Sequence, residues 1–427
     1  MTVFDHKRIT NQQIKLDVKG LRRGVYSDQY FANVVQILEG VSSDLGDMPV
    51  EAQYFNRRQP RTLVAGVDVA LAILKHATGY FEGNQFVDTS AQLDVEAVAD
   101  GVFTTYAGNP MEVQPVIKVR GRYRDFALLE TAMLGVLTRA SRVATNVYHV
   151  LEVSNGKPIL FFPARFDLPD VQAIDGYAYW LAVQRYNHDF NQQMNALVST
   201  DAQGAWWGGE GGGTVPHALI SSFLGDTADA MVAYARHVPV EVPRIALVDF
   251  NNDTVAASLA ILDAYWPYYR AALESGDAES RGRWTLHGVR IDTSSNVRDV
   301  SLEPDGPYGI NPQLIHLVRD SMDAAWERWN VPQAWVDEAK AFCRQVKIVA
   351  SGGFDRARIE NYERENVPVD MYGVGSRFFQ NDSSTSTDYS MDIVRVKPGD
   401  QWIKMAKVGR QPCDNSDLEP VDLSMLE

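Results

Sequence analysis

The sequence predicts an α/β protein in which an irregular (β/α) barrel is joined to an α+β domain. Three observations predict this fold. Short β-branched runs alternate with amphipathic stretches between residues 245 and 378, as in βαβ units. The first 125 residues instead hold two helical patterns followed by strand-like runs, and strand-like alternation returns beyond residue 380. The length of 427 residues exceeds what one compact core of common size needs.

The barrel is predicted from apolar, β-branched runs that are separated by helical patterns. The strand-like runs are IALVDF (245–250), LHGVRID (286–292), VKIVAS (346–351) and VDMYGVGSRF (369–378). The helical patterns between them are TVAASLAILDAYWPYYRAALESG, NPQLIHLVRDSMDAAWERW and RARIENYEREN. This order of elements is typical of a parallel sheet or barrel, which we expect to occupy residues 126–379.

The α+β domain is predicted to combine residues 1–125 with residues 380–427. Helical patterns are expected in SDQYFANVVQILEG and TLVAGVDVALAILKHATGYF, and a strand in MEVQPVIKVRGRY (111–123). We expect the strand-like DYSMDIVRVKPGDQWIKMAKV to pack against this N-terminal region. The final CDNSDLEPVDLSMLE is polar and acidic and is expected to be a loosely held tail.

Composition and charge exclude several classes of function. Hydrophobic residues make up 45% and charged residues 22% of the chain, as in ordinary globular proteins. The net charge of −15, with no long basic run, argues against a nucleic-acid partner. The two cysteines, Cys343 and Cys413, make neither a disulfide framework nor a cysteine-based zinc site. The N-terminus lacks the apolar core of a signal peptide, and no apolar stretch reaches the roughly 20 residues that cross a bilayer. We therefore expect a cytoplasmic protein without a membrane partner.

Polar residues and glycines follow the predicted barrel strands. In a βα barrel the reacting groups lie at the carboxyl ends of the strands and in the loops that follow. This rule selects Asp249, Arg290, Asp292, Ser351, Gly352, Gly353, Gly373, Gly375 and Ser376. Two successive Gly/Ser loops favour binding of a phosphate monoester by backbone amides, although glycine can also serve only a tight βα turn.

Two carboxylates and one arginine add to this set. Asp249 and Asp292 are candidates to hold Mg²⁺ on a diphosphate, because Mg²⁺ takes few protein carboxylates when phosphates share it. For Asp249, capping of the following helix or loop is an equal alternative. Arg165 ends the apolar run ILFFPARFD, where an arginine suits bidentate contact with a carboxylate or a phosphate.

A glycine run in GGEGGGTVPHALI (208–220) directly precedes Thr214, His217 and an apolar helical pattern. Glycine runs persist where the backbone must bend sharply or approach a ligand closely. The run lacks the Lys-Ser/Thr ending of a nucleotide P-loop, so a Walker-type site is disfavoured. The imidazole of His217 suits a general base or a nucleophile that takes up a phosphoryl group, and the spacing leaves both roles open.

These segments together resemble the nicotinate phosphoribosyltransferases, within the type II phosphoribosyltransferases that also include the nicotinamide and quinolinate enzymes. The resemblance runs through most of the chain, in order, and GTVPHALI is similar to the Gly-Thr-x-x-His box of that family. The other matching segments are YSDQY (26–30), GNPMEVQPVIKVRGRYRDFALLETAMLGVL, SRVAT (141–145), FFPARF (161–166), LVDFNND, GVRIDTSS, ASGGFD and YGVGS.

The resemblance implies a specific activity. Such enzymes join nicotinate to 5-phosphoribosyl 1-diphosphate, release diphosphate and form nicotinate mononucleotide for NAD synthesis. Many couple the transfer to hydrolysis of ATP through a phosphorylated histidine, which corresponds to His217. Thr214 would line the nicotinate site, Arg290 would read the carboxylate, and Tyr30 would reach the pyridine ring from the neighbouring subunit of a homodimer or higher oligomer. The 5′-phosphate would be held by Ser351, Gly352, Gly353, Gly373, Gly375 and Ser376.

Three positions depart from the family pattern. Phe166 stands where a second arginine is frequent, Thr293–Ser295 replace a Ser-Gly-Asp sequence, and Pro216 replaces a common alanine. Two alternatives therefore stay open. One is a related enzyme that acts on nicotinamide or quinolinate, and the other is a non-catalytic homologue that binds a phosphoribosyl ligand.

Overall fold

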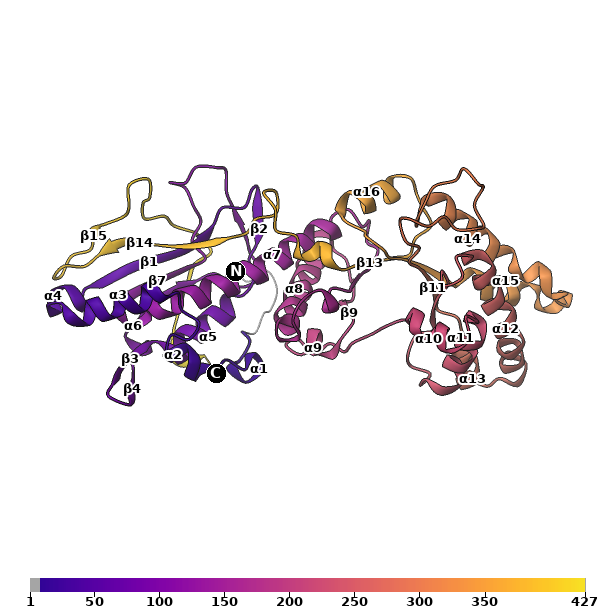
Figure 1. The fold of residues 1–427 in the computed structure, drawn as a ribbon, viewed down its shortest axis with the longest axis horizontal. Coiled ribbons are helices and arrows are strands. Elements are labelled where there is room, and N and C mark those ends of the chain that lie inside the picture. The colour runs from indigo at the N-terminus through magenta and orange to yellow at the C-terminus, as the bar shows by residue number, and fades with distance from the viewer. Residues whose placement is uncertain (1–7, 427) are drawn as a thin grey trace.

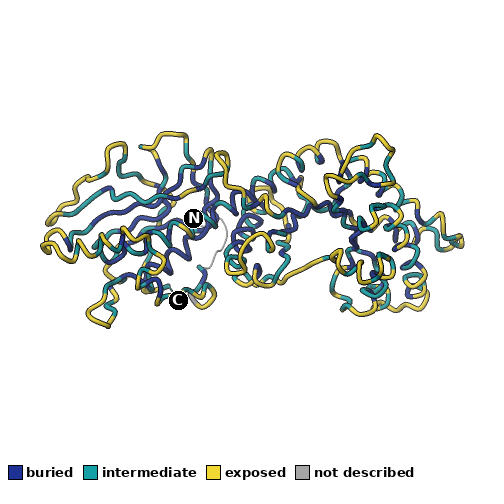
Figure 2. Tube along the Cα trace, viewed as in Figure 1, coloured by how far each residue is buried: buried dark blue, intermediate teal, exposed yellow. Residues whose placement is uncertain are grey.

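The computed structural model describes residues 8–426, which form two lobes arranged along the long axis of the molecule (Figure 1). The first lobe contains a six-stranded sheet in the order β15-β14-β1-β7-β5-β16, and the barrel lobe contains a six-stranded sheet in the order β10-β11-β12-β13-β8-β9. Buried residues run through the middle of each lobe and exposed residues cover its outside (Figure 2).

The sheet of the first lobe is antiparallel throughout. Its central strand β1 is buried along almost its whole length, because helices cover one face and a C-terminal segment covers part of the other. The strands of this sheet are β1 (Pro49–Asn56), β5 (Asp94–Ala97), β7 (Ile117–Arg122), β14 (Tyr389–Val396), β15 (Ile403–Lys404) and β16 (Glu419–Val421). Two short antiparallel pairs accompany it: β2 (Arg61–Leu63) with β6 (Phe103–Thr105), and β3 (Gly79–Glu82) with β4 (Gln85–Asp88).

The helices of the first lobe cover one face of this sheet, called the inner face here (Figure 1). They are α1 (Asn11–Ile14), α2 (Val18–Arg22), α3 (Gln29–Gly40), α4 (Ser43–Gly46), α5 (Val67–Ala77) and α6 (Tyr123–Phe126). The helix predicted over TLVAGVDVALAILKHATGYF is shorter than expected, and its two ends are strands. Gly66 at φ 92° and Gly79 at φ 148° explain the difference, since these backbone angles interrupt a right-handed helix before and after α5.

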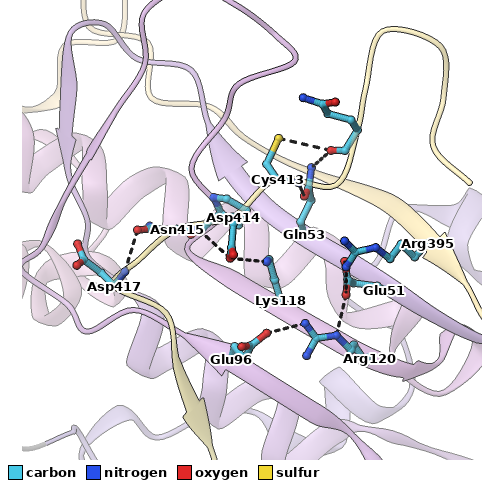
Figure 3. Close-up of polar contacts among 12 residues, drawn as sticks. Glu51, Gln53, Glu96, Lys118, Arg120, Arg395, Cys413, Asp414, Asn415 and Asp417 are labelled. Atoms are coloured by element: carbon cyan, nitrogen blue, oxygen red, sulfur yellow. Dashed lines mark hydrogen bonds and ion pairs between the residues drawn. The ribbon is translucent and has the colours of Figure 1, made fainter. Parts of the chain in front are cut away.

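The acidic C-terminal segment is not the loose tail that its composition suggested. Residues Glu419–Val421 form β16, which pairs with β5, and Leu423 is buried. Lys118 of β7 donates to Asp414, and Cys413 N donates to the side chain of Gln53 on β1, so the segment lies along the outer face of the sheet (Figure 3). Composition missed this arrangement because the contacts join residues about 300 positions apart in the chain.

The polar face beneath this segment is built around Glu51, which is only 1% exposed. Arg120 and Arg395 both donate to its carboxylate, and Arg120 also reaches Glu96 (Figure 3). A buried carboxylate is tolerated when charged donors satisfy its oxygens. This network therefore joins β14, β1, β7 and β5 across the sheet.

The sheet of the barrel lobe is parallel between all its neighbouring strands and curls into half a barrel. Its strands are β8 (Ile159–Phe161), β9 (Leu197–Val198), β10 (Ile245–Leu247), β11 (Gly288–Ile291), β12 (Lys347–Ala350) and β13 (Met371–Val374). The structure thus confirms the predicted α/β fold with its irregular (β/α) barrel. The division of the chain at residues 125 and 380 stays a prediction.

Helices follow most of these strands and form the outside of the lobe (Figure 1). They are α7 (Glu130–Leu151), α8 (Gln172–Phe190), α9 (Asp201–Gly204), α10 (His217–Ser222), α11 (Thr227–His237), α12 (Thr254–Ser275), α13 (Ala278–Arg283), α14 (Pro312–Ala324), α15 (Val336–Arg344) and α16 (Arg356–Arg364). Side-chain caps fix where the main ones begin: Asp253 accepts from Ala256 N, Asn311 from Leu314 N and Asp355 from Arg358 N. Asp253 and Asp355 lie a few residues beyond β10 and β12, so these loops are short, whereas a longer segment separates β11 from the cap at Asn311. Between residues 8 and 426, no helix has both the length and the apolar character that a membrane span requires.

Candidate functional site

A cavity of about 480 Å³ opens at the carboxyl ends of the barrel strands. Its wall contains residues from the loops after β8, β11, β12 and β13 and from the segment that leads into α10. The predicted site residues in this wall are Arg165, Thr214, Arg290, Asp292, Ser351, Gly352, Gly353, Gly373, Gly375 and Ser376. Segments separated by up to about 200 residues therefore meet at one rim, as the position of the strand ends requires.

A chain of hydrogen bonds crosses the floor of this cavity. Arg290, in β11, donates from Nη1 to Thr214 Oγ1 at 2.7 Å and from Nη2 to Asp292 Oδ2 at 3.1 Å. Ser351, just after β12, donates to Asp292 Oδ1 at 2.9 Å. Asp292 thus holds both the arginine and the serine loop in fixed positions. The guanidinium keeps one buried nitrogen, Nε, without a hydrogen-bond partner in the described chain.

His217 and Asp249 form a second pair beside the cavity. His217 begins α10, and its Nε2 lies 3.1 Å from Oδ1 of Asp249, two residues beyond β10. The Asp249 side chain is 7% exposed, whereas that of His217 is 48% exposed. Burial raises the pKa of the Asp249 carboxyl above its ordinary value, the charge of Asp292 adds to this rise, and contact with the imidazole opposes it. A buried carboxylate therefore orients an imidazole that is open to solvent.

The two Gly/Ser loops differ in backbone conformation. Gly352 and Gly353 adopt φ angles of 93° and 75°, which L-residues rarely take. A Cβ at Gly352 would lie 3.0 Å from Oδ1 of Asp292. In the second loop Gly375 precedes a 3₁₀ helix (Ser376–Phe379) and has ordinary negative φ. Both loops expose backbone next to the cavity, which is what amide binding of an anion requires.

The glycine run 208–213 continues the open edge of the barrel sheet. Gly212 N donates to Val198 O of β9, and Gly211 pairs in parallel with Val198. Gly213 has free space where a side chain would be, and the next residue, Thr214, meets Arg290. Figure 2 shows the segment between α9 and α10 as largely exposed. The run therefore carries the backbone from β9 to the cavity wall.

The carboxylates at this rim are few. No group of three or more His, Cys, Asp or Glu side chains that could hold a metal is found within residues 8–426. Both oxygens of Asp292 already accept hydrogen bonds from Arg290 and Ser351. This donor set fits Mg²⁺ only if substrate oxygens and water supply most of its ligands.

Tyr30 lies outside the cavity. It belongs to α3 in the first lobe, which Figure 1 places at the opposite end of the molecule from α10 and β11. Its side chain is exposed, and its ring packs on that of Phe31 with centroids 4.2 Å apart. Within one chain, Tyr30 therefore does not meet the other predicted site residues.

The cavity also contains residues that the sequence did not single out as ligands. Phe162 and Phe166 come from the loop after β8, Arg377 follows Ser376, and Ser199 follows β9. Phe162 belongs to an apolar run in the sequence, and periodicity does not distinguish a core phenylalanine from one that borders a cavity. The position of Arg377, directly after a Gly/Ser loop at a strand end, is the signal that would have found it.

The chain has the fold of the type II phosphoribosyltransferases, and its cavity lies at the carboxyl ends of the parallel strands.

Comparisons with known proteins agree with this fold. Residues 28–141 match the family model of the quinolinate phosphoribosyl transferase N-terminal domain. The structure is similar to nicotinate-nucleotide pyrophosphorylase from Pyrococcus furiosus, with a TM-score of 0.63 and 24% identity over 92% of this chain and 79% of that one. It is also similar to human nicotinic acid phosphoribosyltransferase, with a TM-score of 0.54 and 18% identity over 87% and 75% of the two chains. For NadC from Streptococcus pyogenes the TM-score is 0.52, with 14% identity over 94% and 100% of the chains.

Proposed function

We propose that the protein is a phosphoribosyltransferase of NAD biosynthesis, and specifically one that acts on nicotinate. The reaction would join the ring nitrogen of nicotinate to C1 of 5-phosphoribosyl 1-diphosphate and form nicotinate mononucleotide and diphosphate. The observation that carries the proposal is the cavity in which Arg290, Asp292 and Ser351 are linked between two glycine loops. One structural neighbour, human nicotinic acid phosphoribosyltransferase, is named for this base, and the Pyrococcus furiosus neighbour is named for the nucleotide product.

The reaction requires the protein to position the two substrates and to bind their charged groups. The bond from C1 to the diphosphate oxygen breaks as the bond from the pyridine nitrogen to C1 forms, so positive charge develops on the ribose. No protein nucleophile is needed for this step, and the catalytic gain comes from orientation and from anchored charges. The amides and hydroxyls of the loops at Gly352 and Gly375 would hold the 5′-phosphate at one end of the sugar. Mg²⁺ bound mainly by the diphosphate would offset its charge at the other end.

Arg290 is the candidate residue for binding the nicotinate carboxylate. Its two terminal nitrogens are held by Thr214 and Asp292, so the guanidinium plane has one orientation in the cavity. A planar guanidinium binds a carboxylate through two parallel hydrogen bonds, which an amide cannot reproduce. This contact favours an acid over nicotinamide.

His217 is the candidate acceptor of a phosphoryl group from ATP, which would be a co-substrate. In the neutral imidazole, the Nε2–H donates to Asp249 and leaves the lone pair on Nδ1 as the nucleophile. Transfer would form a bond from Nδ1 to the γ-phosphorus and release ADP, and water would later take the phosphoryl group. The exposure of the imidazole gives a nucleotide access to it.

Tyr30 would act between two copies of the chain. Its ring is exposed and does not line the cavity of its own chain, and α3, which contains it, lies in the other lobe (Figure 1). A homodimer or higher oligomer in which α3 reaches the cavity of the neighbouring subunit would bring the ring to the pyridine.

Quinolinate is the second candidate base, because residues 28–141 match the quinolinate phosphoribosyl transferase N-terminal domain and because Arg165 offers another cation at the cavity. Nicotinate stays the first candidate because His217, held by Asp249, offers the phosphoryl acceptor that an ATP-coupled nicotinate enzyme would use.

The test is incubation of the purified protein with phosphoribosyl diphosphate and Mg²⁺, with nicotinate, nicotinamide or quinolinate, each with and without ATP. We expect nicotinate to give more mononucleotide than nicotinamide or quinolinate. We also expect ATP to speed the turnover of nicotinate. Absence of any mononucleotide, together with binding of phosphoribosyl diphosphate, would favour the non-catalytic homologue instead.

A further inference from the structure

Two phenylalanines of the loop after β8 lie directly on two glycines of the loop after β13. A Cβ at Gly373 would lie 3.0 Å from two ring carbons of Phe162, and a Cβ at Gly375 would lie 2.7 Å from Cε2 of Phe166. A side chain at either glycine would therefore displace one of these rings. The edge of the Phe166 ring at Cε2 and Cδ2 thus lies close to the backbone of the turn that leads to Ser376.

Phe166 is unusual because it is a large apolar side chain at the mouth of a polar cavity. It is 46% exposed, although it contacts Gly375 and borders the cavity. The guanidinium carbon of Arg165 lies 5.3 Å from the centroid of its ring, within the range of a cation–π contact. Arg165 is itself exposed and borders the same cavity, and none of residues 8–426 forms an ion pair with it. Its charge is therefore available to a bound anion.

We propose that Phe166 is a positioning residue for the anion subsite at Gly375 and Ser376. Its ring covers the outer side of this turn and holds the guanidinium of Arg165 at the rim of the cavity. The aromatic face favours one location for a side chain that would otherwise sample many rotamers. The ring also keeps water from one side of the turn, which strengthens the attraction between the arginine and an anion. The inference rests on the proposed function in that the anion would be the 5′-phosphate of the donor.

Inorganic phosphate is the probe that separates this inference from catalysis. Binding of phosphate to the purified wild-type protein and to Phe166→Ala is measured by titration calorimetry at low ionic strength. We expect Phe166→Ala to weaken phosphate binding about 3- to 10-fold, and Phe166→Tyr, which keeps the aromatic face, to retain it. Leu168→Ala is the matched control, because Leu168 is 64% exposed in the same loop and does not border the cavity. An equal loss in Leu168→Ala, or a wild-type protein that binds no phosphate, would overturn the proposal.

A double-mutant cycle tests whether Phe166 acts through Arg165. Arg165→Ala should weaken phosphate binding at least as much as Phe166→Ala. In a protein that already has Arg165→Ala, the further change Phe166→Ala should alter the affinity for phosphate less than about 2-fold. This limit is roughly the usual error of additivity between two substitutions. Independent, additive losses would contradict the positioning role.

Steady-state kinetics add a second readout that a general structural defect would not give. In Phe166→Ala the KM for phosphoribosyl diphosphate should rise about 3- to 10-fold, as expected for a lost cation–π contact, while the KM for the base stays unchanged. An equal rise in both KM values would overturn the proposal. If wild-type protein binds phosphate as described but forms no mononucleotide with any base, the proposed function fails and the positioning role of Phe166 stands.

Discussion

The Nε2 atom of His217 lies 3.1 Å from Oδ1 of Asp249, and this contact joins the first residue of α10 to the loop after β10. The carboxylate is buried and the imidazole is half exposed, so one partner is fixed while the other stays accessible. The pair gives a histidine of defined orientation beside the cavity, next to Pro216, which borders it. Its orientation leads to the first prediction.

Replacement of His217 by alanine should abolish the stimulation of turnover by ATP and leave part of the basal transfer. The reason is that the phosphoryl acceptor is lost while Arg290, Asp292 and the glycine loops stay in place. The measurement is mononucleotide formation with and without ATP, together with acid-labile labelling of the protein by γ-labelled ATP. His188→Ala is the matched control, since His188 is 54% exposed and its Nδ1 lies 3.1 Å from Oδ1 of Asp189. Full stimulation by ATP in His217→Ala would contradict the phosphohistidine role.

Replacement of Arg290 by lysine should raise the KM for nicotinate about 10- to 100-fold, since a charged hydrogen bond contributes about 1.5–3 kcal/mol. Lysine keeps the positive charge but cannot contact Thr214 and a carboxylate in one plane. The KM for phosphoribosyl diphosphate should change much less. Arg270→Lys, which alters an exposed ion pair with Glu274, is the control and should leave both values unchanged. An equal rise in the KM values for nicotinate and phosphoribosyl diphosphate would show that Arg290 does not bind the carboxylate.

The candidate site could be predicted from the sequence where its residues follow strands. Arg290, Ser351 and Gly373 each lie in or directly after an apolar β-branched run, and strand ends of a parallel sheet share one edge. Position in the chain alone therefore predicted that they meet. The contact of His217 with Asp249 was not predictable in this way, because it depends on how the glycine run folds back along β9.

The parts that sequence reasoning missed depend on distant partners. The strand β16 contains Pro420 and charged neighbours, so its local signal is that of a loop, and only pairing with β5 makes it a strand. Phe166 gave no sign of its contact with Gly375, since the two residues are far apart in the chain. In both cases local propensity carries no information about the partner that decides the conformation.

Replacement of Gly352 by alanine should raise the KM for phosphoribosyl diphosphate and destabilise the protein. At φ 93° an L-residue is strained by about 1–2 kcal/mol, and the added Cβ would lie 3.0 Å from Oδ1 of Asp292. The carboxylate that holds Arg290 and Ser351 would have to move. Both KM values and the melting temperature are measured.

Gly276→Ala is the matched control for that substitution. Gly276 ends α12 at φ 72°, and no atom lies within 4 Å of where its Cβ would be. Gly276→Ala should destabilise the protein about as much as Gly352→Ala does, without any change in either KM. If Gly276→Ala raised the KM for the donor as much as Gly352→Ala does, backbone strain alone would account for the effect, and the contact with Asp292 would be irrelevant.

The last prediction concerns Glu130 at the start of α7, which is 9% exposed and accepts a hydrogen bond from Tyr123 at 3.3 Å. Burial raises the pKa of this carboxyl from 4.5 to about 7. A carboxyl whose pKa is raised by folding stabilises the folded state fully below pH 4.5, and this contribution is lost as the pH rises through about 7. The loss amounts to about 3 kcal/mol of unfolding free energy at pH 8.

Glu130→Gln should remove this loss, because glutamine stays neutral at every pH and can still accept from Tyr123. The change in urea midpoint between pH 5 and pH 8, followed by circular dichroism, should therefore be smaller in Glu130→Gln than in the wild-type protein. Glu279→Gln is the control, since Glu279 is an exposed carboxylate paired with Arg283 and should leave the pH dependence unaltered. Identical pH dependence in Glu130→Gln and the wild-type protein would mean that Glu130 is already ionised at pH 5 and that water or a cation reaches it in the folded state.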